Sequence, residues 1–166
     1  MKTKCKLLSL LLVISLILCG CDMLGKTSKT EALSAAIDSY LQNEIYTGED
    51  LPLMMEYQNA LIEKITYEIQ SIDLETRTMD VTFTYIDVLQ LADSITDPNI
   101  AEEEYYAACI DKISSGDYKT ITEVVNVGFE SLDEGYALIQ SEELTNVLSG
   151  GILDYYLELL EEMGHE

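Results

Sequence analysis

The stretch ITYEIQSIDLETRTMDVTFTYIDV, residues 65–88, decides the fold class of this 166-residue chain. Apolar side chains alternate with polar ones in both of its halves, at Ile65, Tyr67 and Ile69 and then at Met79, Val81, Phe83 and Tyr85. Successive side chains of a β-strand point to opposite faces, so this period of two predicts two half-buried antiparallel strands joined by a polar turn at residues 73–76. The apolar phase slips between Ile69 and Ile72, which predicts a β-bulge.

The segments around this hairpin show helical and strand patterns in separate runs. Apolar residues recur at helical spacing over residues 29–46, 52–63, 87–94 and 97–115. Alternation returns in YKTITEVVNVGF, residues 118–129, and in EGYALIQ, residues 134–140, which predicts a second hairpin. A last helix is expected from Ser141 onward. This order predicts an α+β domain: a curved antiparallel sheet of about four strands with helices packed on one face.

Two helix boundaries carry specific signals. Asp97 followed by Pro98 predicts a helix start, because aspartate caps helices and proline is favoured in the first turn. Gly116 predicts the end of the same helix. In the last segment, Gly150 and Gly151 interrupt a helical pattern and together cost about 2 kcal/mol relative to alanine. We therefore expect a kink there, or a close approach of the helix to another part of the backbone.

The amino terminus has the pattern of a secretory signal peptide. Three lysines precede the apolar run LLSLLLVISLILCG, which is shorter than the about 20 residues needed to span a membrane. The run ends in Leu18, Cys19, Gly20 and Cys21, which together resemble the lipobox of bacterial lipoproteins. The resemblance implies cleavage between Gly20 and Cys21 and a diacylglycerol on the Cys21 thiol. Cys19 suits this role less well, because Leu18 would then occupy the small position before the cut.

These assignments divide the chain into a signal peptide at residues 1–20, a lipidated tether at residues 21–28 and an α+β domain at residues 29–166. Acyl chains such as palmitate on Cys21 would place the protein at the cell membrane, on its extracytoplasmic face. A disulfide between Cys19 and Cys21 would need a strained ring. A metal site built on these two cysteines would need a second pair of ligands, and only one other cysteine lies further along the mature chain. That cysteine, Cys109, is flanked by alanines on a helical pattern, which is typical of a buried small hydrophobe.

The chain is strongly acidic, with 31 acidic and nine basic residues and a formal charge of −22. Removal of residues 1–20 takes away three lysines and no acid, which gives a charge of −25. Nucleic acids and anionic lipid headgroups are bound through basic patches, so the composition excludes nucleic-acid binding. A solvated acidic face that keeps the domain soluble beside a membrane is the simplest interpretation, and cation binding is permitted without being required.

The sequence offers no motif for catalysis, metal binding or cofactor binding. The single histidine, His165, lies one residue from the end, so no Ser-His-Asp, Cys-His or zincin arrangement is available. The acids form no EF-hand pattern, and the glycines form no phosphate-binding loop. We therefore predict no catalytic residue, no metal and no cofactor.

Eleven tyrosines, with no tryptophan, dominate the aromatic residues. Tyr67 and Tyr85 lie on the inward phases of adjacent predicted strands, and Tyr105 and Tyr155 lie on helices that could cover them. Tyrosine offers a flat apolar body and a hydroxyl, so these four residues are candidates for the lining of a ligand pocket. The alternative is that they lie at the margin of the core with their hydroxyls in water.

The lipobox LCGC, the leading helix, the hairpin of residues 65–88 and the ending LTNVLSGGI, residues 144–152, together resemble small lipoproteins of Gram-positive bacteria with an NTF2-like, or cystatin-like, domain. The resemblance implies a curved sheet around a long helix, with a conical pocket used for catalysis in some relatives and for binding or dimerisation in others. The leading hypothesis is a lipid-anchored, non-catalytic module that binds a small ligand or a cell-envelope protein. Two further hypotheses are an enzyme using carboxylates and a tyrosine in the concavity, and a homodimer formed through an exposed sheet face.

Overall fold

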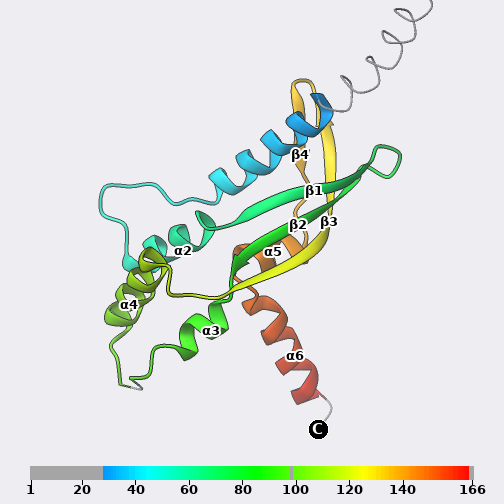
Figure 1. Cartoon of the computed structure of the whole chain (residues 1–166). Helices are drawn as coiled ribbons and strands as arrows, with labels where there is room; N and C mark the ends of the chain where they lie inside the picture. The colour runs from blue at the N-terminus through cyan, green and yellow to red at the C-terminus, as the bar shows by residue number, and fades with distance from the viewer. Residues whose placement is uncertain (1–27, 98, 165–166) are drawn as a thin grey trace, which may run out of the picture.

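The computed structural model describes residues 28–97 and 99–164 and confirms the α+β class (Figure 1). After a first helix over residues 28–43, the elements are α2 (Leu53–Ile62), β1 (Thr66–Asp73), β2 (Thr78–Ile86), α3 (Val88–Asp93), α4 (Glu102–Ser115), β3 (Thr120–Leu132), β4 (Gly135–Leu138), α5 (Glu142–Leu148) and α6 (Ile152–Gly164). The four strands form one open antiparallel sheet in the order β1-β2-β3-β4. Each strand therefore pairs with its neighbour in sequence.

The hairpin of β1 and β2 has the bulge that the sequence predicts. Ile69 pairs with Val81, whereas Ser71 pairs with Asp80, so the register shifts across Gln70. The extra residue restores the apolar phase on the inner face beyond this point. Both halves of the hairpin therefore present their apolar side chains to the same core.

The sheet has one covered face and one open face. The covered face packs against the first helix and α5, in a core formed by Leu33, Ile37, Ile65, Met79, Val81, Phe83, Tyr85, Val125, Val127, Phe129, Leu144 and Val147. The opposite face carries polar side chains, among them Thr84 and Thr122, whose hydroxyl oxygens lie 2.9 Å apart. Val124 on this face is 64% exposed. The first helix and α5 thus cover one face of the sheet, in agreement with the α+β prediction.

A second core lies beyond the end of the sheet and was not predicted. It joins α2, α3 and α4 through the buried residues Tyr57, Leu61, Ile86, Val88, Leu91, Cys109 and Ile113. Cys109 is fully buried there as a free thiol, and burial raises its pKa. The burial of Cys109 agrees with the prediction that it acts as a small buried hydrophobic residue. The residues of both cores lie between Leu33 and Ile152, so a chain that begins at Asp22 keeps both cores complete.

The expected helix start at Asp97 is wrong. The Asp97 carboxylate accepts a hydrogen bond from the Asn99 N–H at 2.9 Å, and α4 begins only at Glu102 after the cap residue Ala101. Aspartate can bond to a nearby backbone N–H in a turn as readily as at a helix cap, which explains the error. Pro98 lies outside the described residues. Gly116 ends α4 in the left-handed conformation, as predicted.

The expected single helix after Ser141 is also wrong, because Gly150 and Gly151 separate α5 from α6. Both glycines have positive φ angles, 67° and 83°, which end a helix. The expected close approach to another backbone is confirmed. The Gly150 carbonyl accepts a hydrogen bond from the Val88 N–H at 3.1 Å, and a Cβ on Gly150 would lie 2.8 Å from the Ile86 carbonyl oxygen and overlap the Val88 side chain.

Gly150→Ala tests this junction. A Cβ would meet two neighbours in a backbone conformation that strains L-residues, so we expect the free energy of unfolding to fall by about 3 kcal/mol or more. Gly116→Ala is the matched control, because Gly116 also has a positive φ but its added Cβ would meet nothing within 4 Å. Its expected cost is about 1 kcal/mol. Urea denaturation followed by circular dichroism measures both, and equal losses would contradict the packing role of Gly150.

Candidate functional site

The inner face of the sheet is filled by side chains rather than open. Leu33 and Ile37 of the first helix and Leu144 and Val147 of α5 are buried against it. Tyr85 on this face is only 2% exposed, and its hydroxyl donates a hydrogen bond to Glu123 Oε1 at 2.7 Å. Burial, followed by this bond and the charge of Glu123, raises the pKa of Tyr85. The concavity where a pocket was expected is therefore part of the core.

The structure does not bring the four candidate pocket tyrosines together. Tyr67 and Tyr85 pack in the sheet core, and Tyr105 packs against the second core. Tyr155 lies on α6 and is 46% exposed. Figure 1 shows why: α6, in red, leaves the body of the domain after the two glycines. The apolar pattern predicted one long helix packed against the domain. Its second half is α6, whose described tyrosines are exposed to solvent.

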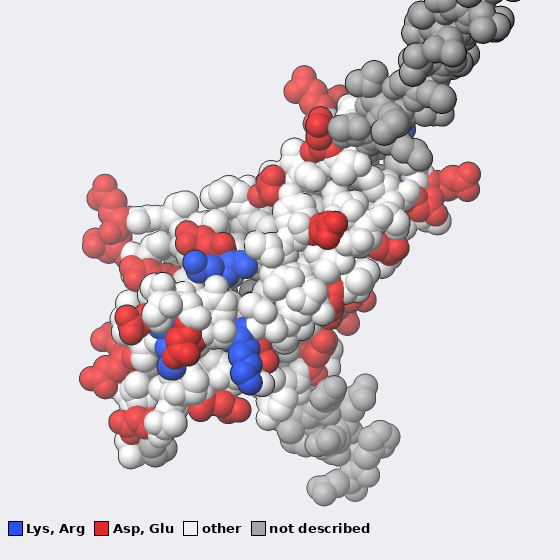
Figure 2. Space-filling view, viewed as in Figure 1, with Lys and Arg blue, Asp and Glu red and all other residues white. Residues whose placement is uncertain are grey.

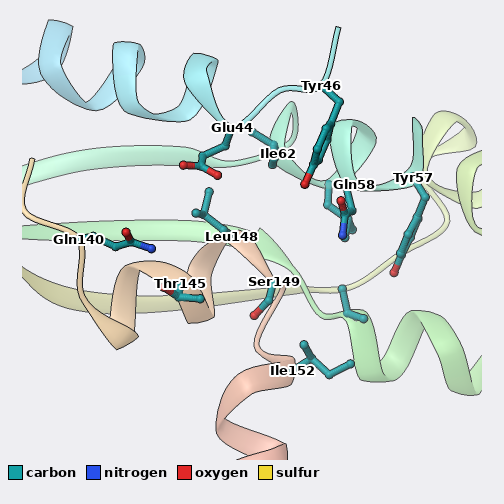
Figure 3. A pocket seen from close by; sticks show the side chains of 12 residues that line it. Glu44, Tyr46, Tyr57, Gln58, Ile62, Gln140, Thr145, Leu148, Ser149 and Ile152 are labelled. Carbon is teal, nitrogen blue, oxygen red and sulfur yellow. The ribbon is translucent and has the colours of Figure 1, made fainter. Parts of the chain in front are cut away.

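A cleft opens instead between the two cores (Figure 3). It has a volume of about 370 Å³ and is lined by Glu44, Tyr46, Tyr57, Gln58, Leu61, Ile62, Val88, Gln140, Thr145, Leu148, Ser149 and Ile152. One side comes from the end of the first helix, the following loop and α2. The other side comes from α5, the glycine junction and the start of α6. Its size and mixed apolar and polar lining are typical of small-molecule sites.

An asparagine side chain fixes each side of this cleft. On the first side, Asn59 accepts a hydrogen bond from the Tyr46 N–H and donates one to the Tyr46 carbonyl, both at 2.8 Å. On the other side, buried Asn146 accepts from the Asp154 N–H at 3.1 Å and donates to the Asp154 carboxylate at 2.8 Å. Tyr46 and the start of α6 are therefore held in place by paired side-chain bonds.

The cleft offers acceptors from Glu44, Thr145 and Ser149, and both donors and acceptors from the side-chain amides of Gln58 and Gln140 and the hydroxyls of Tyr46 and Tyr57. The Thr145 hydroxyl donates to the Ser141 carbonyl, and the Ser149 hydroxyl donates to the Asn146 carbonyl. Each oxygen keeps lone pairs that can accept further bonds. Glu44 is the one acidic residue among the lining residues, and none of them is basic. The pKa of Tyr57 is raised, mainly by burial, so its hydroxyl stays protonated at neutral pH.

Little in the sequence indicates this cleft. The pattern of residues 52–63 places Tyr57 at the border of the apolar face of that helix, but Glu44, Tyr46 and Ser149 belong to no motif. Their meeting depends on how α2 and the α5–α6 junction pack in three dimensions. Acidic side chains form separate patches over the face seen in Figure 2, and they outnumber the basic ones, as the composition implies.

Gly20, Cys21 and the signal peptide lie outside the described residues, as does the tether up to residue 27. Across residues 28–97 and 99–164, no group of three or more His, Cys, Asp or Glu side chains is arranged to hold a metal ion. Within those same ranges, no helix is both long and apolar enough to cross a membrane.

Comparison of the chain with protein-family models, with curated proteins and with solved structures gives no match. The assignment of a function therefore rests on the residues and on the geometry of the cleft.

Asn59→Ala tests how the loop at Tyr46 is held. Loss of both bonds should cost about 1 kcal/mol, which corresponds to roughly five-fold faster hydrogen exchange of the Tyr46 amide. Asn126→Ala is the control, because Asn126 bonds to Asp80 on the open face of the sheet. It should leave the Tyr46 amide unchanged. Unchanged exchange in Asn59→Ala would show that other contacts hold the loop.

The raised pKa of Tyr67 predicts that the free energy of unfolding falls at alkaline pH. Burial and a 2.7 Å bond to Asp38 raise its pKa from 10.0 to about 12. Between these values the unfolded tyrosine ionises while the folded one stays neutral, so the free energy of unfolding should fall as pH rises from about 10 to 12. Tyr67→Phe should make this fall shallower in urea titrations at several pH values. Tyr155→Phe, on exposed α6, should keep the wild-type slope, and equal slopes in all three proteins would refute the effect.

Proposed function

We propose that this protein is a lipid-anchored binding module of the NTF2-like type, held at the extracytoplasmic face of the cell membrane. The observation that carries the binding role is the cleft of about 370 Å³, which is lined by apolar walls and polar groups. In the NTF2-like resemblance, the inner face of the curved sheet forms the pocket. Here core side chains fill that face, which supports a non-catalytic role.

The tether keeps the cleft close to the membrane. A diacylglycerol on Cys21 has two acyl chains, each contributing about 0.8 kcal/mol per buried methylene, which gives firm anchoring. The described helix begins at residue 28, seven residues later. An extended chain of that length spans at most about 25 Å. The cleft lies at the other end of the first helix, which runs over residues 28–43 and adds about 24 Å, so the module would work within about 50 Å of the membrane.

The alternative function, a carboxylate–tyrosine enzyme, has one observation in its favour. The Tyr85 hydroxyl and the Glu123 carboxylate form the kind of pair that acid–base chemistry needs. Tyr85 is almost completely buried, however, and its raised pKa keeps it protonated. A substrate cannot reach the hydroxyl without displacing the core, so the binding module is the better-supported proposal.

Cys21→Ala tests the anchor. We expect the variant to lose incorporation of labelled palmitate and to move from the membrane fraction to the soluble fraction of producing bacterial cells. Cys19→Ala is the matched control, since it alters a cysteine two residues away and should remain lipidated and membrane-bound. Membrane retention with label in Cys21→Ala would refute the assignment, and loss of label in Cys19→Ala alone would transfer it to Cys19.

A further inference from the structure

We propose that the cleft between the two cores binds a small organic ammonium ion, meaning a protonated amine attached to an apolar body. This inference rests on the proposed binding function and names the ligand class of the same site. Three properties of the lining residues lead to it: their charge, their hydrogen-bonding state and the division of the cleft into polar and apolar parts.

The charge of the cleft selects against anions. Glu44 supplies a carboxylate, and no lysine or arginine is among the lining residues. An anion entering the cleft would lose water without gaining an opposite charge, which is costly. An ammonium ion would gain the Glu44 carboxylate as a partner. The flat ring of Tyr46, which belongs to the same side of the cleft in Figure 3, can add a cation–π contact.

Two hydroxyl oxygens of the cleft can only accept hydrogen bonds from a ligand. The protons of Thr145 and Ser149 are already given to carbonyls of their own helix, at 2.9 Å and 3.0 Å. These hydroxyl oxygens can only accept from a ligand. An ammonium group carries up to three N–H donors and no acceptor, so it matches a site of carboxylate and hydroxyl acceptors. The cleft also offers donors, from the amides of Gln58 and Gln140 and the hydroxyl of Tyr57, so the preference for an ammonium group rests on the Glu44 carboxylate together with these two oxygens.

The remaining lining residues define the body of the ligand. Apolar walls come from Leu61, Ile62, Val88, Leu148 and Ile152. They lie on both sides of the cleft, so an alkyl or aryl group between them would be enclosed. The volume of about 370 Å³ is near the lower end of small-molecule pockets, which favours one compact molecule over a polymer segment.

Three six-carbon probes test the proposal on the chain that begins at Asp22, which contains both cores. Hexylammonium, hexan-1-ol and hexanoate share their body and differ in the head group. Amide chemical shifts of Tyr46 and Leu148 are followed by NMR at pH 7 and 150 mM NaCl, where distant charges are screened. We expect saturable shifts with hexylammonium, about ten-fold weaker binding of hexanol and no saturation with hexanoate.

Two isosteric variants separate the effect of the Glu44 carboxylate on ligand affinity from the effect of the protein's general negative charge. Glu44→Gln should reduce hexylammonium affinity about ten-fold and leave hexanol unaffected. Glu49→Gln removes an exposed acid from the same loop that does not line the cleft, and it should bind like the wild type. Equal losses in both variants would overturn the proposal, because attraction would then come from bulk charge.

The outcomes also separate this inference from the proposed function. If hexanol or hexanoate shifts the cleft amides as strongly as hexylammonium, the ammonium preference is refuted and the binding module stands. If no probe shifts them, the ammonium proposal is again refuted, and the cleft loses its support as a site for small ligands. Membrane anchoring is judged independently by the Cys21 and Cys19 variants.

Discussion

The backbone contact between Gly150 and the end of β2 joins the two halves of this molecule. Val88 donates its N–H to the Gly150 carbonyl, and the glycine lies so close to Ile86 that no side chain fits between them. Ile86 and Val88 belong to the second core, whereas α5, just before the glycine, packs against the sheet. One close approach of two backbones therefore fixes both cores relative to each other.

The cleft is a consequence of this junction. Leu148 and Ser149 precede Gly150, and Ile152 follows it, so three residues of one side of the cleft are placed by the same contact. The opposite side is placed by α2, which the second core holds through Tyr57 and Leu61. A change in how the cores meet would alter the width of the cleft before it altered either core. The width of the cleft and the packing of the two cores are therefore coupled in this fold.

Local patterns in the sequence predicted the elements well, because each pattern reports which face of an element is buried. The period of two identified all four strands, and the phase slip after Ile69 located the bulge. The same reasoning failed where one pattern has two structural meanings. Asp97 makes a turn rather than a cap, and the apolar residues of α6 follow a helical pattern although Tyr155 is exposed. The cleft was not predicted, since its lining residues meet only through tertiary packing.

The acidic surface and the ammonium proposal are linked by one physical effect. If the chain is tethered beside a membrane as proposed, its charge of −25 without residues 1–20 would be repelled by anionic headgroups, which would keep the domain in the aqueous layer. The same field raises the local concentration of cations around the domain, within about 8 Å at physiological ionic strength. Such a field attracts every cation alike, so it cannot provide selectivity. Selection would come from the cleft, where Glu44 offers a charge and the walls offer an apolar surface that a simple metal ion cannot use.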